Sequence, residues 1–228
     1  MSPNSLTPSQ LAQMLDSTFL KPYGTYEDLV KHCAEARQYG FAMVAIHPAE
    51  VEHCVQLLQG CPVRVGAAIG FPLGQNTSAV KLYETQDAIA RGAGEIDMVI
   101  NVRLLQSGEL PLVRGEIASM VKACQAQGVI SKVILETCYL TDAQKRLVCR
   151  IALEEGADFV KTSTGFAPGG ATVEDIRLMR SVVGQKMGVK ASGGIRNLQT
   201  ALAMIEAGAT RLGTSSAAAI VEELKNRG

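Results

Sequence analysis

The chain has 228 residues, of which 47% are hydrophobic, and its 22 basic and 22 acidic residues leave a formal net charge of zero. This apolar content is enough for the core of one globular domain. No linker or change of composition divides the chain, so we expect a single domain over residues 1–228. The charge balance argues against a nucleic-acid-binding or membrane-surface protein, because both carry a local excess of lysine and arginine.

Hydropathy and the cysteine pattern further limit the class of protein to which the chain can belong. No apolar run approaches the roughly 18 residues that span a bilayer, and residues 1–11 lack the apolar centre of a signal peptide. The six cysteines form no C-x-x-C pair and the three histidines have no metal-ligand spacing, so we expect reduced thiols and no metal site. These features predict a cytoplasmic protein that binds neither membranes nor nucleic acid.

Amphipathic segments of helical period alternate with short apolar segments along nearly the whole chain. Thr7 followed by Pro8 predicts an extra helix before the first strand. Further along, the spacing of Thr25–Asp28, Thr141–Gln144 and Thr172–Asp175 predicts three helix starts with capping boxes. The apolar segments predict eight strands, at Asp16–Leu20, Phe41–Ile46, Val63–Ile69, Glu95–Asn101, Lys132–Glu136, Asp158–Lys161, Val189–Ala191 and Arg211–Gly213.

Eight strands that alternate with helices imply parallel pairing through right-handed crossovers. Their number and the chain length favour a (β/α)8 TIM barrel with an extra N-terminal helix, and an open doubly wound sheet is the alternative. Active sites of such barrels lie at the C-terminal ends of the strands and in the loops that follow. The residues at those positions are therefore the candidates for function.

Two lysines end consecutive predicted strands. Lys161 follows Val160 and Lys190 follows Val189, and if both valines face the helices, both lysines point into the mouth of the barrel. Neighbouring strands lie about 4.8 Å apart, so the two ammonium groups would repel each other. This repulsion and partial burial both lower a lysine pKa toward the range of an amine nucleophile. The like charge can supply most of the change, and the share that belongs to burial stays open. The residues alone do not decide which lysine reacts.

Acidic residues stand near these lysines. Asp97 interrupts an otherwise apolar strand, either as the ion-pair partner of a lysine or as a group that transfers protons. Glu136, at the end of its strand, could pair with a lysine or stabilise the mouth. Asp16 and Thr18 could hydrogen-bond to substrate hydroxyls, although Asp16 is equally placed to act as a capping residue.

The last two strands are followed by loops that contain glycine. Ser192-Gly193-Gly194 precedes a helix that begins near Asn197, and Gly213-Thr214-Ser215-Ser216 precedes the final helix. Glycines let backbone N–H groups approach an anion, and helix N-termini favour negative charge. Both loops together predict a phosphate site, with a simple turn as the alternative for either loop alone. No Walker loop, G-x-G-x-x-G or G-x-S-x-G sequence supports an NTPase, a dinucleotide-binding protein or a hydrolase.

Seven segments carry a combined pattern: Leu15–Thr18, Gly70–Gly74, Glu95–Asn101, Val133–Leu140, Phe159–Phe166, Val189–Ile195 and Arg211–Ser216. In this order, and over nearly the whole chain, the pattern resembles the deoxyribose-phosphate aldolase family. The resemblance implies a (β/α)8 barrel that reversibly cleaves 2-deoxy-D-ribose 5-phosphate to D-glyceraldehyde 3-phosphate and acetaldehyde. It further implies a lysine imine with no metal or other cofactor, sugar phosphates and aldehydes as partners, and a homodimer or homotetramer.

The family's functional residues can be carried over position by position. The resemblance implies that Lys161 forms the Schiff base, that Lys190 tunes it, and that Asp97 transfers protons. The two glycine loops would hold the phosphate. The substrate-binding residues would be Asp16, Thr18, Thr164, Gly165, Gly193, Gly194, Gly213, Ser215 and Ser216.

The chain departs from the family pattern at two points. Ala45 stands where many members have a cysteine, which removes a thiol that could react with aldehydes. Some longer members end in a tyrosine tail, whereas this sequence reads Asn226-Arg-Gly228, so we expect Asp97 and water to deliver protons. Two other functions stay open: a class I aldolase for another phosphorylated sugar, and a barrel that binds a sugar phosphate without catalysis.

Overall fold

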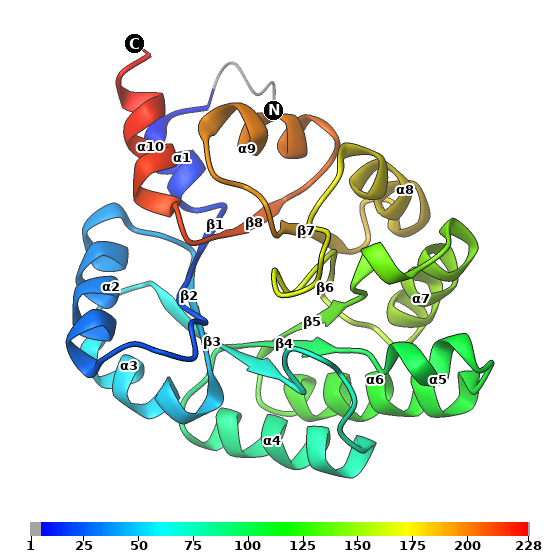
Figure 1. Ribbon diagram of the computed structural model, residues 1–228. Coiled ribbons are helices and arrows are strands. Elements are labelled where there is room, and N and C mark those ends of the chain that lie inside the picture. Colours follow the sequence, from blue (N-terminus) through cyan, green and yellow to red (C-terminus); the bar gives the residue numbers. More distant parts are fainter. Residues whose placement is uncertain (1–5, 228) are drawn as a thin grey trace.

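The computed structural model describes residues 6–227, in which eight parallel strands close into a barrel surrounded by helices (Figure 1). The order of strands around the barrel is their order along the chain, and β8 pairs with β1 through Leu212 and Leu15, which excludes the open sheet. The predicted (β/α)8 barrel is confirmed, and each strand begins and ends within two residues of its predicted bounds. The strands are β1 (Leu15–Thr18), β2 (Met43–Ile46), β3 (Arg64–Ile69), β4 (Glu95–Val99), β5 (Ile130–Ile134), β6 (Phe159–Lys161), β7 (Gly188–Ser192) and β8 (Arg211–Thr214).

The helices form the outer ring, and the predicted extra helix α1 lies beside α10 (Figure 1). Two short 3-10 turns, η2 (Pro48–Glu50) and η3 (Thr137–Tyr139), follow β2 and β5. The α-helices are α1 (Pro8–Ala12), α2 (Tyr26–Tyr39), α3 (Val51–Leu57), α4 (Ser78–Ala90), α5 (Val102–Gln106), α6 (Leu110–Gln125), α7 (Asp142–Glu154), α8 (Val173–Val183), α9 (Leu198–Glu206) and α10 (Ala217–Lys225).

Helix starts follow the predicted capping sequences with one exception. Complete capping boxes begin α2 at Thr25 and α7 at Thr141, and a third begins α1. At α8, the Thr172 hydroxyl accepts the N–H of Asp175, but the Asp175 carboxylate bonds to Lys145 at 2.6 Å and makes no return bond to Thr172. The predicted capping box at Thr172 is therefore only half formed, because a charged partner from α7 competes for the carboxylate.

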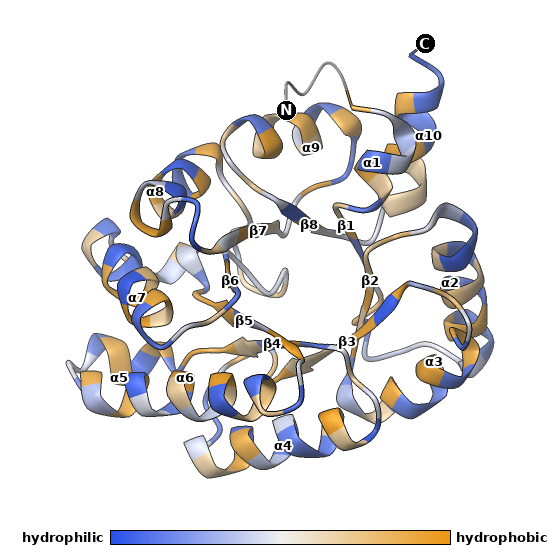
Figure 2. Ribbon diagram, turned by 180° about the vertical axis from the view of Figure 1, so that it is seen from behind, coloured by the Kyte–Doolittle hydropathy of each residue, from blue (hydrophilic) through white to orange (hydrophobic). Residues whose placement is uncertain are grey.

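Alternation along the strands divides the molecule into two buried regions. Outward-facing residues such as Ile96, Val160 and Val189 lie between the barrel and the helices and are fully buried. Figure 2 shows the largely hydrophobic strands inside a ring of helices that carry both hydrophobic and hydrophilic residues. The inside of the barrel, by contrast, holds charged groups, since the inward-facing Asp97 and Lys190 are also almost completely buried. These interior charges must satisfy one another, because water does not reach them.

Over residues 6–227, none of the helices combines the length and the hydropathy that crossing a bilayer requires.

Candidate active site

Lys161 and Lys190 lie side by side on β6 and β7. Their Cα atoms are register partners, and Val160 and Val189 face the helices, as the alternation predicts. Both ammonium groups donate to the same oxygen of Asp97 on β4, with Nζ–Oδ2 distances of 2.7 Å. The structure thus brings together the three residues that the sequence singles out for chemistry.

A third lysine, absent from the sequence-based candidates, occupies the other oxygen of Asp97. Lys132 on β5 is the register partner of Asp97, and its Nζ lies 2.7 Å from Asp97 Oδ1. It also forms an ion pair with Glu95. A signal for Lys132 was present in the sequence, because it stands in a predicted strand beside an apolar run. A lysine buried in that way needs an anionic partner.

Further ion pairs adjoin this group inside the barrel. Arg211 on β8 donates from Nε to Asp16 Oδ1 at 2.8 Å and from Nη2 to Glu95 Oε2 at 3.0 Å. Asp16 also pairs with Lys190, with an Nζ–Oδ2 distance of 2.5 Å. Burial would raise the pKa of Asp16, but Lys190 and Arg211 outweigh it and hold the pKa below its usual value. Asp16 therefore contacts two cations, whereas the sequence suggested substrate hydroxyls or a helix cap as its partners.

The buried network carries an excess of positive charge when every group is ionised. Its buried members are four cations and three anions, namely Lys132, Lys161, Lys190 and Arg211 with Asp16, Glu95 and Asp97. The exposed Arg64 adds a longer ion pair to Glu95, at 3.6 Å. An uncompensated charge is costly in a buried site, so loss of one proton from a lysine relieves the network.

Lys161 is a lysine of this network with a lowered pKa. Burial is the largest influence and lowers the pKa of Lys161 to about 8, while Asp97 opposes this change and Lys190 and Lys132 add to it. The share of Lys190 in this change, which the sequence left open, is therefore smaller than that of burial. Asp97 binds both lysines and offsets part of the change, but the loss of hydration when the barrel closes around the amine outweighs it.

Asp97 itself stays ionised. Burial alone would raise its pKa, but Lys132, Lys161 and Lys190 together hold the pKa well below its usual value. At neutral pH the site therefore offers a fraction of free amine next to a carboxylate that keeps its charge.

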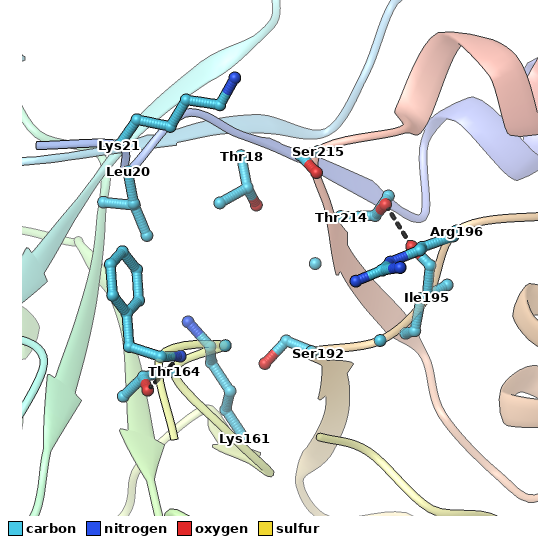
Figure 3. A pocket seen from close by; sticks show the side chains of 15 residues that line it. Thr18, Leu20, Lys21, Lys161, Thr164, Ser192, Ile195, Arg196, Thr214 and Ser215 are labelled. Atoms are coloured by element: carbon cyan, nitrogen blue, oxygen red, sulfur yellow. Dashed lines mark hydrogen bonds between the residues drawn. The ribbon is translucent and has the colours of Figure 1, made fainter. Parts of the chain in front are cut away.

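A cavity of about 240 Å³ opens at the C-terminal end of the barrel, with Lys161 in its wall (Figure 3). Within residues 6–227, Lys161 is the one member of the buried ionic network that lines it. Ser216 also stays outside this cavity, because it begins α10 and its N–H donates to Thr214 Oγ1 at 2.9 Å. The other predicted binding residues that do line the cavity are Thr18, Thr164, Gly165, Gly193, Gly194, Gly213 and Ser215.

One side of the cavity is suited to an anion. Gly193 and Gly194 have φ of 85° and 81°, which L side chains rarely adopt, and they precede α9 just as Gly213 precedes α10. Arg196 also lines this side, near Thr214 and Ser215 in Figure 3. Two glycine loops and a guanidinium group together can hold a phosphate.

Arg196 and Lys21, both in the cavity wall, were absent from the sequence-based candidates. Figure 3 shows Lys21 on the side of the cavity away from Arg196. Arg196 stands two residues after Gly194, and that position next to a predicted phosphate loop was the available signal. Lys21 lies in the loop after β1, where a single lysine is ordinarily a solvated surface residue.

Comparisons with known proteins agree with this geometry. A family model described as DeoC/LacD family aldolase matches residues 9–222. The deoxyribose-phosphate aldolase of Bacteroides thetaiotaomicron is 66% identical over 221 residues, which cover 97% of this chain and 93% of that protein. The deoxyribose-phosphate aldolase of Caldanaerobacter subterraneus subsp. tengcongensis is 54% identical over 219 residues, which cover 96% of this chain and 95% of that protein.

Solved structures give the same result. The tetrameric deoxyribose phosphate aldolase from Aeropyrum pernix matches with a TM-score of 0.90 at 36% identity, covering 97% of this chain and 94% of that chain. The match of the family model to residues 9–222 and the 66% identity with a named relative lead to one conclusion: this chain belongs to the DeoC/LacD family of aldolases.

Proposed function

We propose that the protein is a deoxyribose-phosphate aldolase, which reversibly cleaves 2-deoxy-D-ribose 5-phosphate to D-glyceraldehyde 3-phosphate and acetaldehyde through a Schiff base on Lys161. The environment of Lys161 carries the proposal: a buried amine with a pKa of about 8 in the wall of a cavity that can hold a phosphate. Family membership and the activity for which the relatives are named support it.

The reaction begins with the free amine. At pH 7 an amine with a pKa of 8 is deprotonated in about one molecule in ten, whereas an ordinary lysine is deprotonated in fewer than about one in a thousand. Lys161 attacks the aldehyde carbon of the open-chain substrate, and loss of water leaves an iminium ion. Lys161 lines the cavity and Lys190 does not, which favours Lys161 as the nucleophile. Asp97, whose Oδ2 lies 2.7 Å from Lys161 Nζ, can pair with the positive iminium nitrogen.

Carbon–carbon cleavage uses the iminium as the electron sink. As the C2–C3 bond breaks, its electrons form an enamine on Lys161, and the C3 hydroxyl loses its proton to become the aldehyde of glyceraldehyde 3-phosphate. We expect water to carry this proton to Asp97, which releases it again readily because its pKa is low. Protonation of the enamine carbon and hydrolysis then release acetaldehyde. These steps need no metal ion or cofactor, because the iminium withdraws the electrons.

The phosphate end of the substrate is proposed to lie against the two glycine loops. Gly193, Gly194, Gly213 and Ser215 bring backbone groups to that side of the cavity, and Arg196 adds a positive charge. Binding there would direct the aldehyde end of the substrate toward Lys161, on β6.

Assembly and location form the last part of the proposal. The Aeropyrum pernix relative is described as tetrameric, which supports a homodimer or homotetramer here, and light scattering of the purified protein tests it. A cytoplasmic location is tested by fractionation of cells that produce the chain.

The central experiment traps the imine. Borohydride added together with acetaldehyde should reduce the Schiff base and leave an ethyl group on Lys161, which peptide mapping by mass spectrometry locates. Lys161→Arg should abolish both trapping and cleavage, whereas Lys186→Arg, an exposed lysine after α8, should behave as wild type. Labelling of another lysine in place of Lys161 would refute the proposed nucleophile. Binding of the sugar phosphate without any labelling would indicate a barrel that binds but does not catalyse.

The same assay separates the sugar substrates. If another phosphorylated sugar is the better substrate, its kcat/KM will exceed that of 2-deoxyribose 5-phosphate in a panel of phosphorylated aldehydes and sugars.

A further inference from the structure

Glu136 lies two residues after β5, the strand next to β6, and has an unusual backbone conformation. In the part of the chain that the structure describes, it is the one residue other than glycine with a positive φ, at φ 56° and ψ 64°. L side chains rarely adopt this left-handed region, and such a conformation persists where neighbouring contacts determine it. The contacts on both sides of Glu136 are therefore informative.

The backbone on either side of Glu136 bonds to the end of β6 and to the residue that follows it. The N–H of Leu135 donates to the carbonyl of Lys161 at 2.9 Å, and the N–H of Thr137 donates to the carbonyl of Thr162 at 3.0 Å. Between these two bonds the chain turns at Glu136, and its side chain reaches the segment that follows Lys161.

The carboxylate of Glu136 is buried and bonds to one residue. It accepts the N–H of Thr164, at 3.2 Å to Oε1 and 3.3 Å to Oε2, and the hydroxyl of Thr164, at 2.5 Å to Oε2. No lysine or arginine in residues 6–227 lies within ion-pair distance of it. The sequence left open whether Glu136 pairs with a lysine, and the structure shows that its partner is Thr164. Burial raises the pKa of Glu136, while the bonds to Thr164 and the nearby charge of Lys161 lower it.

Thr164 is part of a wall between two cavities. Thr164 and Phe166 line both the cavity of Lys161 and a second cavity of about 610 Å³, whereas Glu136 lines only the second. The Thr164 hydroxyl oxygen accepts the N–H of Phe166 at 3.1 Å (Figure 3), and the Phe166 ring packs edge-on against Phe71, with centroids 5.3 Å apart. Glu136 thus contacts this wall from the second cavity, whereas Lys161 lines the first.

We infer that Glu136 is a positioning residue for the aldol reaction: its carboxylate holds Thr164, and through Thr164 the wall that confines the substrate next to Lys161. The inference rests on the proposed aldolase function. A carboxylate suits this role because it accepts from the N–H and the O–H of Thr164 together. A glutamine at the same place can accept both through its one oxygen, but it lacks the negative charge that strengthens these hydrogen bonds.

The first test is Glu136→Gln. Loss of a charge-assisted hydrogen bond in a buried site should lower kcat about 10- to 100-fold, with KM changed much less, because the phosphate side of the cavity is untouched. Borohydride should still label Lys161 in this variant, since the amine remains in place. Glu206→Gln, an exposed glutamate at the end of α9, is the matched control and should retain wild-type kinetics.

The second test asks whether Glu136 acts through Thr164. Thr164→Val removes the hydroxyl and should reduce kcat by a similar factor, and the double variant should be no slower than the slower single variant. Wild-type kcat in Glu136→Gln, even with a lower unfolding midpoint, would overturn the inference, and so would additive losses in the double variant. Failure of the wild-type protein to be labelled at Lys161 would instead overturn the proposed function.

Discussion

Replacing Lys190 by methionine tests why the pKa of Lys161 is low. A change in pKa from 10.5 to about 8 corresponds to about 3 kcal/mol of differential interaction between the charged and neutral amine. Burial is its largest source, and Lys190→Met leaves the burial of Lys161 in place while removing one like charge. Asp97 also loses one of its three lysines and attracts Lys161 more strongly. We therefore expect the pKa of Lys161 to rise in the variant but to stay closer to 8 than to 10.5.

The assay is the rate of imine formation with acetaldehyde as a function of pH, measured by rapid borohydride trapping from about pH 6 to 11. The wild-type rate should increase about tenfold per pH unit at low pH and level off above about pH 8. Lys186→Met, which removes an exposed lysine, should not move this profile. A profile for Lys190→Met that levels off only near the usual lysine pKa would show that the like charge dominates, and would refute the argument from burial.

Three further predictions concern stability and substrate recognition. Between about pH 8 and 10.5, Lys161 binds fewer protons in the native protein than in the unfolded chain, so the wild-type free energy of unfolding should rise over that window by about 3 kcal/mol relative to Lys161→Met. If urea titrations give the same difference in unfolding free energy between the two proteins at every pH, this prediction is wrong. Lys132→Met removes one partner from the carboxylates of Asp97 and Glu95 and should lower the free energy of unfolding by about 3–5 kcal/mol. The double variant with Glu95→Gln should lose less, and equal losses in the two variants would argue against the buried pair. Arg196→Ala should raise KM for phosphorylated acceptors at least about tenfold, but not for acceptors without phosphate, and an equal effect on both would exclude a phosphate contact.

The fold could be read from local sequence because its determinants are local. Capping at Thr25 and Thr141 depends on residues three positions apart, and the strand alternation depends on adjacent residues, so both were visible without the structure. The same alternation placed Lys161 and Lys190 on the inner face of neighbouring strands. The prediction failed where a distant residue intervened, as at Thr172, whose capping partner is engaged by α7.

The buried charges show what only the tertiary structure decided. Lys132 lies 35 positions from Asp97, and no short pattern links the two, yet strand register makes them partners. Arg196 lines the cavity together with residues of the loops after β7 and β8, which the strand order brings side by side. The cause of the low pKa of Lys161 also lies outside the local sequence. Neighbouring charges can be guessed from the order of strands, but loss of hydration exists only once the barrel has closed around the amine.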